Sequence, residues 1–189
     1  LIVILQNLKT YNMVLLSGPN INGNEWKYVK DCLDTGWVSS VGSYVTDFEK
    51  QISNYVGSKY AIATSSGTTA LHLSLLLSEV KNNDLVLVTN VTFIATLNAI
   101  KYVGASPILI DIDENSWQMD LDLLTDFLDS KTEIRDDVCI LKSTSQRIKA
   151  IVPVHVLGNM CDMNKLVSIC KKYNISIVED AAESLGSSF

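Results

Sequence analysis

The sequence predicts an α/β fold in which a mainly parallel sheet is flanked by helices. Three observations support this prediction. Hydrophobic residues make up 47% of the 189 residues and charged residues only 19%, so the chain can bury a core. From Tyr60 onward, short apolar runs alternate with longer segments whose apolar residues recur at helical spacing. The short runs (LVLV, PILI, AIVPV and ISIV) are continuously apolar, which is typical of strands buried on both faces of a parallel sheet.

Two helices are predicted before the sheet, in the first third of the chain. Asn22 and Glu25 have the spacing of a capping box, which marks the start of a helix that Gly36 ends. The second helix ends at Gly57 and carries charged residues between its apolar ones. The apolar residues at helical spacing are Trp26, Val29 and Leu33 in the first helix and Val45, Phe48, Ile52 and Tyr55 in the second. We therefore expect residues 1–58 to form a helical arm.

The α/β part is expected over residues 59–189, as an incomplete larger domain. Its predicted strands span residues 60–64, 85–89, 107–112, 148–154 and 175–178. Its predicted helices span residues 68–80, 92–103, 121–128 and 163–173. Gly104 and Asn174 end two of these helices, and Asp162 precedes the last one as an N-cap. The polar stretch 129–147 is expected to be a surface loop or an insertion. Strand–helix–strand alternation favours right-handed crossovers and hence parallel strands.

Composition and charge exclude several classes of function. The formal net charge is −6, and an acidic chain without a basic run binds polyanions poorly, so we expect no nucleic-acid or membrane partner. The four cysteines contain no C-x-x-C pair, which favours reduced thiols and a cytoplasmic location. His72 and His155 are far apart and lack ligand spacing, so no metal site is predicted. No apolar run reaches the ~18 residues that a membrane span needs.

The predicted topology indicates where a ligand would bind. In open α/β sheets, ligands bind beyond the carboxyl ends of the strands, in loops that lead into helices. The segments 65–69, 90–93 and 179–184 satisfy this condition. The candidate functional residues are therefore sought in these three segments.

The first segment, SSGTTAL, has the features of a phosphate-binding turn. Gly67 allows close approach of a ligand, and the N–H groups of Thr68 and Thr69 are expected to point outward at the positive end of the helix dipole. The alternative is that the Ser and Thr residues serve only as N-caps. The segment matches neither GxxxxGK[ST] nor GxGxxG, which argues against ATP and against a Rossmann dehydrogenase.

The other two segments supply an acid and an aromatic ring. Asp180 follows the last strand and could hold a pyridine nitrogen protonated, or it could cap the next turn or contact a ribose. Phe93 could stack on a ligand ring or belong to the core. His155, after the strand that ends at Val154, could orient a substrate or be a satisfied structural group.

Four motifs occur in a fixed order: SSGTTAL, TNVTFIATLNAIKYVGASPILIDID, PVHVLGNMCDM and IVEDAAESLGS. In this order they resemble the motifs of the DegT/DnrJ/EryC1/StrS aminotransferases, which are pyridoxal-phosphate-dependent sugar aminotransferases of fold type I. The segment GPNINGNEWKYVKDCLDTGWVSSVGSYVTDFEK resembles the entry segment of members that act on nucleotide-linked 4-keto-6-deoxy sugars. The resemblance covers nearly the whole chain after about residue 17 and implies the large cofactor domain of that fold.

The resemblance implies a set of residues that bind pyridoxal 5′-phosphate (PLP). These are Gly67, Thr68 and Thr69 at the phosphate, Phe93 stacked on the pyridine ring, Asp180 at the pyridine nitrogen and Glu183 near the phenolic oxygen. Glu183 departs from the Gln or His that is common at this position. An ionised side chain there would be repelled by an oxyanion unless it is protonated or turned away.

The resemblance also implies a Schiff-base lysine that this sequence lacks at the expected place. In the family that lysine follows the strand that bears the aspartate, whereas the last lysine here, Lys172, precedes Asp180. We therefore expect an N-terminal fragment of a longer enzyme, with the catalytic residue unknown and no activity on its own.

The expected activity of the whole enzyme is the transfer of an amino group to a nucleotide-linked keto-deoxy sugar for surface-polysaccharide biosynthesis. The expected partners are the nucleotide-sugar substrate, an amino-acid donor (glutamate) and a second copy in a homodimer. Two alternatives remain: a PLP-dependent sugar dehydratase of the same family, and a non-catalytic remnant domain.

Overall fold

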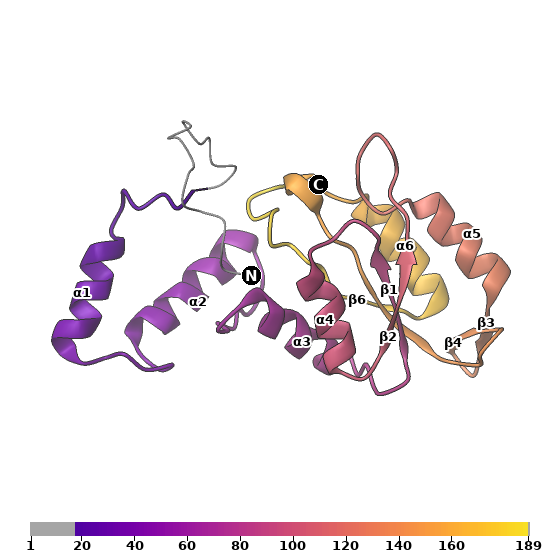
Figure 1. Ribbon diagram of the computed structural model, residues 1–189, viewed down its shortest axis with the longest axis horizontal. Helices are drawn as coiled ribbons and strands as arrows, with labels where there is room; N and C mark the ends of the chain where they lie inside the picture. Colours follow the sequence, from indigo (N-terminus) through magenta and orange to yellow (C-terminus); the bar gives the residue numbers. More distant parts are fainter. Residues whose placement is uncertain (1–17, 189) are drawn as a thin grey trace, which may run out of the picture.

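A four-stranded parallel sheet forms the centre of the molecule. We analysed a computed structural model of the protein that describes residues 18–188 (Figure 1). The sheet order is β2-β1-β5-β6, and all three pairings are parallel. The strands are β1 (Leu85–Thr89), β2 (Ser106–Ile110), β5 (Ile148–Val152) and β6 (Ser176–Ile177). Every residue of β1 is buried, as its continuous apolar run predicts.

Helices cover both faces of this sheet. On one face lie α3 (Gly67–Leu77) and α4 (Ile94–Tyr102), whose Leu75 and Ile100 pack in a cluster with Val88 of β1. On the other face lie α5 (Leu121–Lys131) and α6 (Met163–Tyr173), which pack in a second cluster with Leu87 and Ile151. Side chains alternate along β1, so Leu85 and Leu87 belong to one cluster and Val86 and Val88 to the other. This confirms the predicted α/β class.

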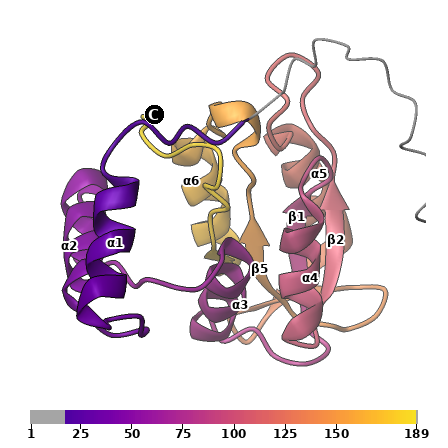
Figure 2. The same cartoon turned by 60° about the vertical axis from the view of Figure 1, so that its left-hand side comes forward.

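The two N-terminal helices lie side by side, away from the sheet (Figure 2). They are α1 (Glu25–Thr35) and α2 (Ser43–Val56), and they end at Gly36 and Gly57 in the left-handed conformation, with φ of 75° and 69°. Neither helix buries any of its residues within the described part of the chain. The predicted arm 1–58 therefore contains these helices, while its first 17 residues, like Phe189, lie outside the described residues.

The predicted capping box at the start of α1 is wrong. Asn24, not Asn22, is the residue before the helix, and it makes no side-chain cap. The Glu25 carboxylate instead accepts a hydrogen bond from the Gly23 N–H at 2.9 Å. The helix begins at Glu25, two residues later than a box that starts at Asn22 requires, so Glu25 is the first helical residue and not the third.

Two further predictions about the sheet region need correction. Residues 60–64 form no strand: they are an extended connection to α3, with the Ala63 N–H bound to the Glu49 carboxylate at 2.8 Å. Residues 129–147 are not only loop, because β3 (Thr132–Arg135) and β4 (Val138–Leu141) pair as an antiparallel hairpin. Its turn residues Asp136 and Asp137 both have positive φ, 52° and 60°, as a tight hairpin turn requires.

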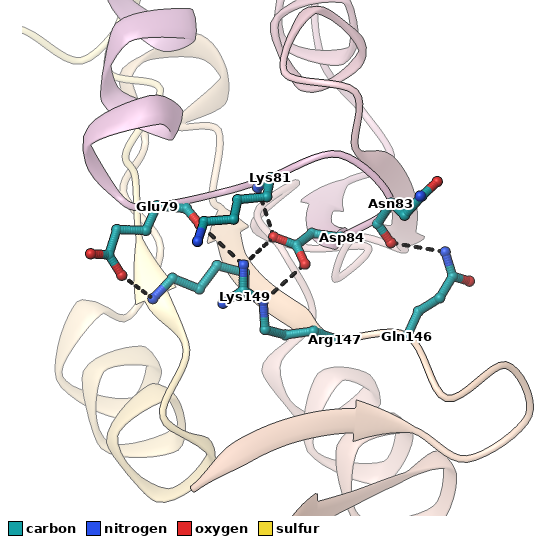
Figure 3. Close-up of polar contacts among 7 residues, drawn as sticks. All are labelled: Glu79, Lys81, Asn83, Asp84, Gln146, Arg147 and Lys149. Atoms are coloured by element: carbon teal, nitrogen blue, oxygen red, sulfur yellow. Dashed lines mark hydrogen bonds and ion pairs between the residues drawn. The ribbon is translucent and has the colours of Figure 1, made fainter. Parts of the chain in front are cut away.

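An ion pair joins the amino ends of β1 and β5, opposite the edge where a ligand is expected (Figure 3). The Asp84 carboxylate receives two hydrogen bonds from Arg147, at 2.9 and 2.5 Å, and a third from the Lys81 N–H at 2.7 Å. Arg147 also donates to the Glu79 carbonyl at 3.1 Å. The pairing with Asp84 raises the pKa of Arg147. This bidentate contact joins the residues that directly precede β1 and β5.

Candidate functional site

A pocket of about 460 Å³ opens at the carboxyl edge of the sheet, where the sequence predicts a ligand. Three loops line it. Thr92 and Phe93 follow β1, His155 and Leu157 follow β5, and Asp180 and Glu183 follow β6. The structure thus brings together three of the six predicted cofactor residues, Phe93, Asp180 and Glu183.

Asp180 is held firmly at the end of the sheet. It forms a parallel bridge with Val154, and its N–H donates to the Pro153 carbonyl at 3.0 Å. The buried Thr96 hydroxyl donates to Oδ2 of Asp180 at 2.6 Å, and the Ala182 N–H donates to Oδ1 at 3.3 Å. A carboxylate has about four acceptor positions, so these two donors leave Asp180 able to accept a further N–H from a ligand. Asp180 therefore caps the following turn and also faces the pocket.

The hydroxyl contact to Asp180 comes from α4 and was not found by sequence reasoning. Thr96 itself accepts a hydrogen bond from the Thr92 hydroxyl at 3.0 Å, so a short chain of hydroxyls leads to the carboxylate. Both threonines lie in the TNVTFIATLNA motif, but a threonine in an apolar helix gives no signal of its partner. Only the packing of α4 against the end of the sheet reveals it.

Phe93 projects from the surface at the mouth of the pocket. It immediately precedes α4 and is 75% exposed, so it does not belong to either core cluster of the described chain. An exposed aromatic ring beside an acid can stack on a flat ligand. The interpretation of Phe93 as a core residue is thus not supported.

Glu183 already has a partner on the pocket wall. Its carboxylate accepts a hydrogen bond from the Leu157 N–H at 2.6 Å. Leu157 has a left-handed backbone (φ 56°, ψ 25°) within a short 3-10 turn, and Gly158 follows with φ 78°. The Glu183 carboxylate thus lines the pocket with one of its oxygens bound to a backbone donor.

The SSGTTAL turn starts α3 and does not line the pocket. The Ser66 hydroxyl caps the helix by accepting from the Thr69 N–H at 3.2 Å, so that N–H does not point outward as predicted. Within residues 18–188, the N–H groups of Gly67 and Thr68 have no hydrogen-bond partner. These two donors at a helix N-terminus fit a phosphate. The role of Gly67, Thr68 and Thr69 stays a prediction.

The chemistry of the pocket fits a flat nitrogen heterocycle. Asp180 offers an acceptor for a ring N–H and Phe93 offers a face for stacking. The N-terminus of α3, a helix that packs against α4, has donors for an anion but does not line this pocket. No lysine lines the pocket in the part of the chain that the structure describes. Taken together, these groups can bind and polarise a cofactor such as PLP.

Comparison with known proteins supports this assignment. The sequence pattern of the DegT/DnrJ/EryC1/StrS aminotransferase family matches residues 19–189. The chain is 37% identical over 176 residues to the GDP-perosamine synthase of Caulobacter vibrioides, covering 93% of this chain and 43% of that protein. The chain therefore spans less than half the length of this relative.

Two solved structures share the fold. An aminotransferase from Psychrobacter cryohalolentis superposes with a TM-score of 0.77 at 28% identity, over 90% of this chain and 40% of that one. A GDP-4-keto-6-deoxymannose-3-dehydratase with a trapped PLP-glutamate geminal diamine superposes with a TM-score of 0.76 at 27% identity, over 93% and 42%. The sheet and its covering helices are thus those of the large domain of PLP-dependent aminotransferases, and PLP is the cofactor of these proteins. The chain belongs to the DegT/DnrJ/EryC1/StrS aminotransferase family.

Proposed function

We propose that this chain forms the arm and much of the PLP-binding domain of a sugar aminotransferase. The observation that carries the proposal is the Asp180 carboxylate, which is fixed by Thr96 at the end of the sheet and faces the pocket beside Phe93. When bound, the cofactor supplies an electron-poor ring that stabilises negative charge on the reacting carbon. The boundary between arm and domain, near residue 58, is part of the proposal.

The residues of this chain would bind and orient the cofactor. Asp180 would accept the ring N–H and keep that nitrogen protonated, and Phe93 would pack on one face of the ring. Gly67, Thr68 and Thr69 would hold the phosphate through backbone N–H and hydroxyl groups. Glu183, bound to the Leu157 N–H, would shape the wall near the phenolic oxygen without placing a free charge there. The Schiff-base lysine would come from outside this chain.

We propose a nucleotide-linked keto-deoxy sugar as the amino acceptor and glutamate as the donor. The names of the two relatives above support this, since one is a GDP-perosamine synthase and the other is named for a GDP-linked keto sugar and a glutamate adduct. The amino group would pass from glutamate to the keto carbon of the sugar, and 2-oxoglutarate would leave. Surface-polysaccharide biosynthesis is the corresponding proposed role.

The test uses the protein made from its complete reading frame. Titration with PLP should produce an absorbance band in the visible or near-ultraviolet range, and glutamate with a GDP-linked 4-keto-6-deoxy sugar should give an amino sugar by mass spectrometry. Other nucleotide-linked keto sugars form the comparison series. A protein that neither binds PLP nor aminates any sugar in the series would refute the proposal.

A 3-dehydratase is the second candidate, favoured by the similarity to the GDP-4-keto-6-deoxymannose-3-dehydratase. The pocket would bind PLP in the same way in both enzymes. The products differ, because amination adds nitrogen to the sugar whereas dehydration removes a hydroxyl group without adding nitrogen. The mass of the sugar product therefore separates the two activities.

The arm helices support a proposed homodimer. Their apolar side chains are exposed in the isolated chain, among them Trp26 at 71%, Leu33 at 63% and Phe48 at 56%. A second copy that covers this surface would remove it from water. Light scattering of the complete protein tests this, and a monomer at micromolar concentration would contradict it.

The proposed location is the cytoplasm, because all four cysteines are free thiols. None of the helices between residues 18 and 188 combines the length and hydrophobicity needed to cross a bilayer.

A further inference from the structure

His155 is a fully buried polar residue at the pocket to which the proposed function gives no role. It follows β5 and lines the pocket, but its side chain is 0% exposed. A large substrate therefore has little access to the ring, and the structure argues against direct substrate contact. Both ring nitrogens make hydrogen bonds, and the partners belong to the loops that carry the pocket residues.

The hydrogen bonds of His155 define its tautomer. Nδ1 accepts a hydrogen bond from the Cys161 N–H at 3.3 Å, so this nitrogen carries no proton. Nε2 lies 3.1 Å from Oε2 of Glu179, and since one nitrogen must carry the proton, Nε2 donates to this carboxylate. The bond from His155 lowers the pKa of Glu179, which keeps the acceptor ionised. The ring is therefore the neutral Nε2–H form.

These bonds tie together the two loops that carry the pocket residues. The His155 N–H donates to the Asp180 carbonyl at 3.2 Å, while its ring holds Glu179, the neighbour of Asp180. The hydrogen bond from the Cys161 N–H to Nδ1 of His155 joins two parts of the loop that follows β5. This loop contains Leu157, the donor to Glu183.

We propose that His155 is a positioning residue for the cofactor: through Glu179 and Cys161 it sets the placement of Asp180 and of the Leu157–Glu183 contact. This inference rests on the proposed PLP function and adds a role that acts through other residues. A positioning error of about an ångström at a catalytic group has large effects on rate, so the hydrogen bonds matter even though the ring touches no ligand.

The test separates the two bonds with matched variants of the complete protein. His155→Gln keeps an N–H donor within reach of Glu179 and loses the acceptor for Cys161. His155→Asn keeps an acceptor near Cys161 and loses the donor to Glu179. Glu179→Gln retains an acceptor for the ring, whereas Glu179→Ala removes it. For each variant, the PLP dissociation constant, the wavelength of the bound-PLP absorbance band and the apo melting temperature are measured.

We expect His155→Asn and Glu179→Ala to weaken PLP binding on the order of tenfold and to shift the absorbance band. Glu179→Gln should stay close to the wild type in both readouts, and His155→Gln, which loses only the acceptor for Cys161, should show a smaller loss than His155→Asn. If His155→Asn and Glu179→Ala lower the melting temperature but leave affinity and band unchanged, the role is purely structural and the inference is overturned.

A direct measurement of the tautomer gives a second readout that does not depend on the cofactor. Long-range ¹H–¹⁵N correlation spectra of the apo protein should show His155 as the neutral Nε2–H form. A proton on Nδ1 would overturn the inference. A wild type that does not bind PLP would refute the proposed function together with this inference, whereas normal PLP binding by the wild type and by His155→Asn would overturn the inference alone.

Discussion

The Thr96 hydroxyl donates a 2.6 Å hydrogen bond to the Asp180 carboxylate, although 84 positions separate the two residues along the chain. This contact links the helix after β1 to the loop after β6 across the sheet. It occupies one acceptor position of Oδ2, while the Ala182 N–H occupies one of Oδ1.

Thr96→Val should weaken PLP binding on the order of tenfold, because Asp180 loses a buried donor to its charged form. Thr96→Ser retains the hydroxyl and should bind PLP nearly as well as the wild type. The measurement is a PLP titration followed by absorbance, with melting curves of each apo protein. Equal affinity of the valine variant and the wild type would show that Thr96 does not support the site.

Asp180→Asn should lower the rate of amino transfer on the order of 10²-fold or more, because an amide does not hold the ring nitrogen protonated. The amide has the same shape and still accepts from Thr96, so PLP affinity should fall less than the rate does. Single-turnover kinetics with glutamate, alongside PLP titration, separate the two effects. An active asparagine variant would exclude the proposed role of Asp180.

Gly67→Pro should weaken PLP binding on the order of tenfold, since it deletes one backbone donor proposed for the phosphate. Proline is tolerated at the first position of a helix, and the preceding Ser66 is extended, as proline requires. Gly67→Ala keeps the N–H, and its Cβ would meet no atom within 4 Å, so it is the matched control. If alanine weakens binding as much as proline does, the N–H is not the cause.

Asp84→Asn should destabilise the fold by about 2–3 kcal/mol, because it breaks the bidentate pair and leaves the Arg147 guanidinium without its anion. Glu79→Gln removes the ion pair with Lys149, which is 3.7 Å long and involves a Glu79 side chain that is 76% exposed. This control should change stability by only about 0.5 kcal/mol or less. Urea unfolding measures the free energy of unfolding of both variants. Equal losses would contradict the expectation that the Asp84–Arg147 pair contributes more than the Glu79–Lys149 pair.

Native thiol labelling at pH 8 should modify Cys139, Cys161 and Cys170 only on unfolding. Burial raises the pKa of Cys139, that of Cys161 to about 11 and that of Cys170 to about 12. At pH 8 roughly one Cys161 in a thousand is then a thiolate, and the buried sulfur is also shielded from the reagent. Rapid reaction of two or more thiols per native chain would contradict this prediction.

The elements that the sequence predicted well are those whose apolar pattern is set by burial. Residues 85–89 and 163–173 coincide with β1 and α6, because a strand covered on both faces and a helix with one apolar face leave clear periodicities. Asp162 indeed caps α6, with its carboxylate accepting from the Lys165 N–H at 2.9 Å. Local signals of this kind are readable without knowledge of the tertiary structure.

The errors arise where long-range contacts decide the structure. Residues 60–64 are apolar like a strand but find no partner strand, and the residues of the β3–β4 hairpin are too polar to resemble a buried strand. In the site, Asp180 was identified from its place after a strand, and Glu183 from the family resemblance. Their partners Thr96 and Leu157 were not, because a hydroxyl in a helix and a backbone N–H carry no sequence signal.

The order of the strands has a consequence for synthesis on the ribosome. β1 lies between β2 and β5, and β5 is made only after α5 and the β3–β4 hairpin. While the nascent chain ends within residues 111–147, one side of β1, which has four apolar residues followed by Thr89, is therefore an unpaired edge. A pause in translation at this stage would leave a segment prone to aggregation, and the emergence of Ile148–Val152 is the step that closes it.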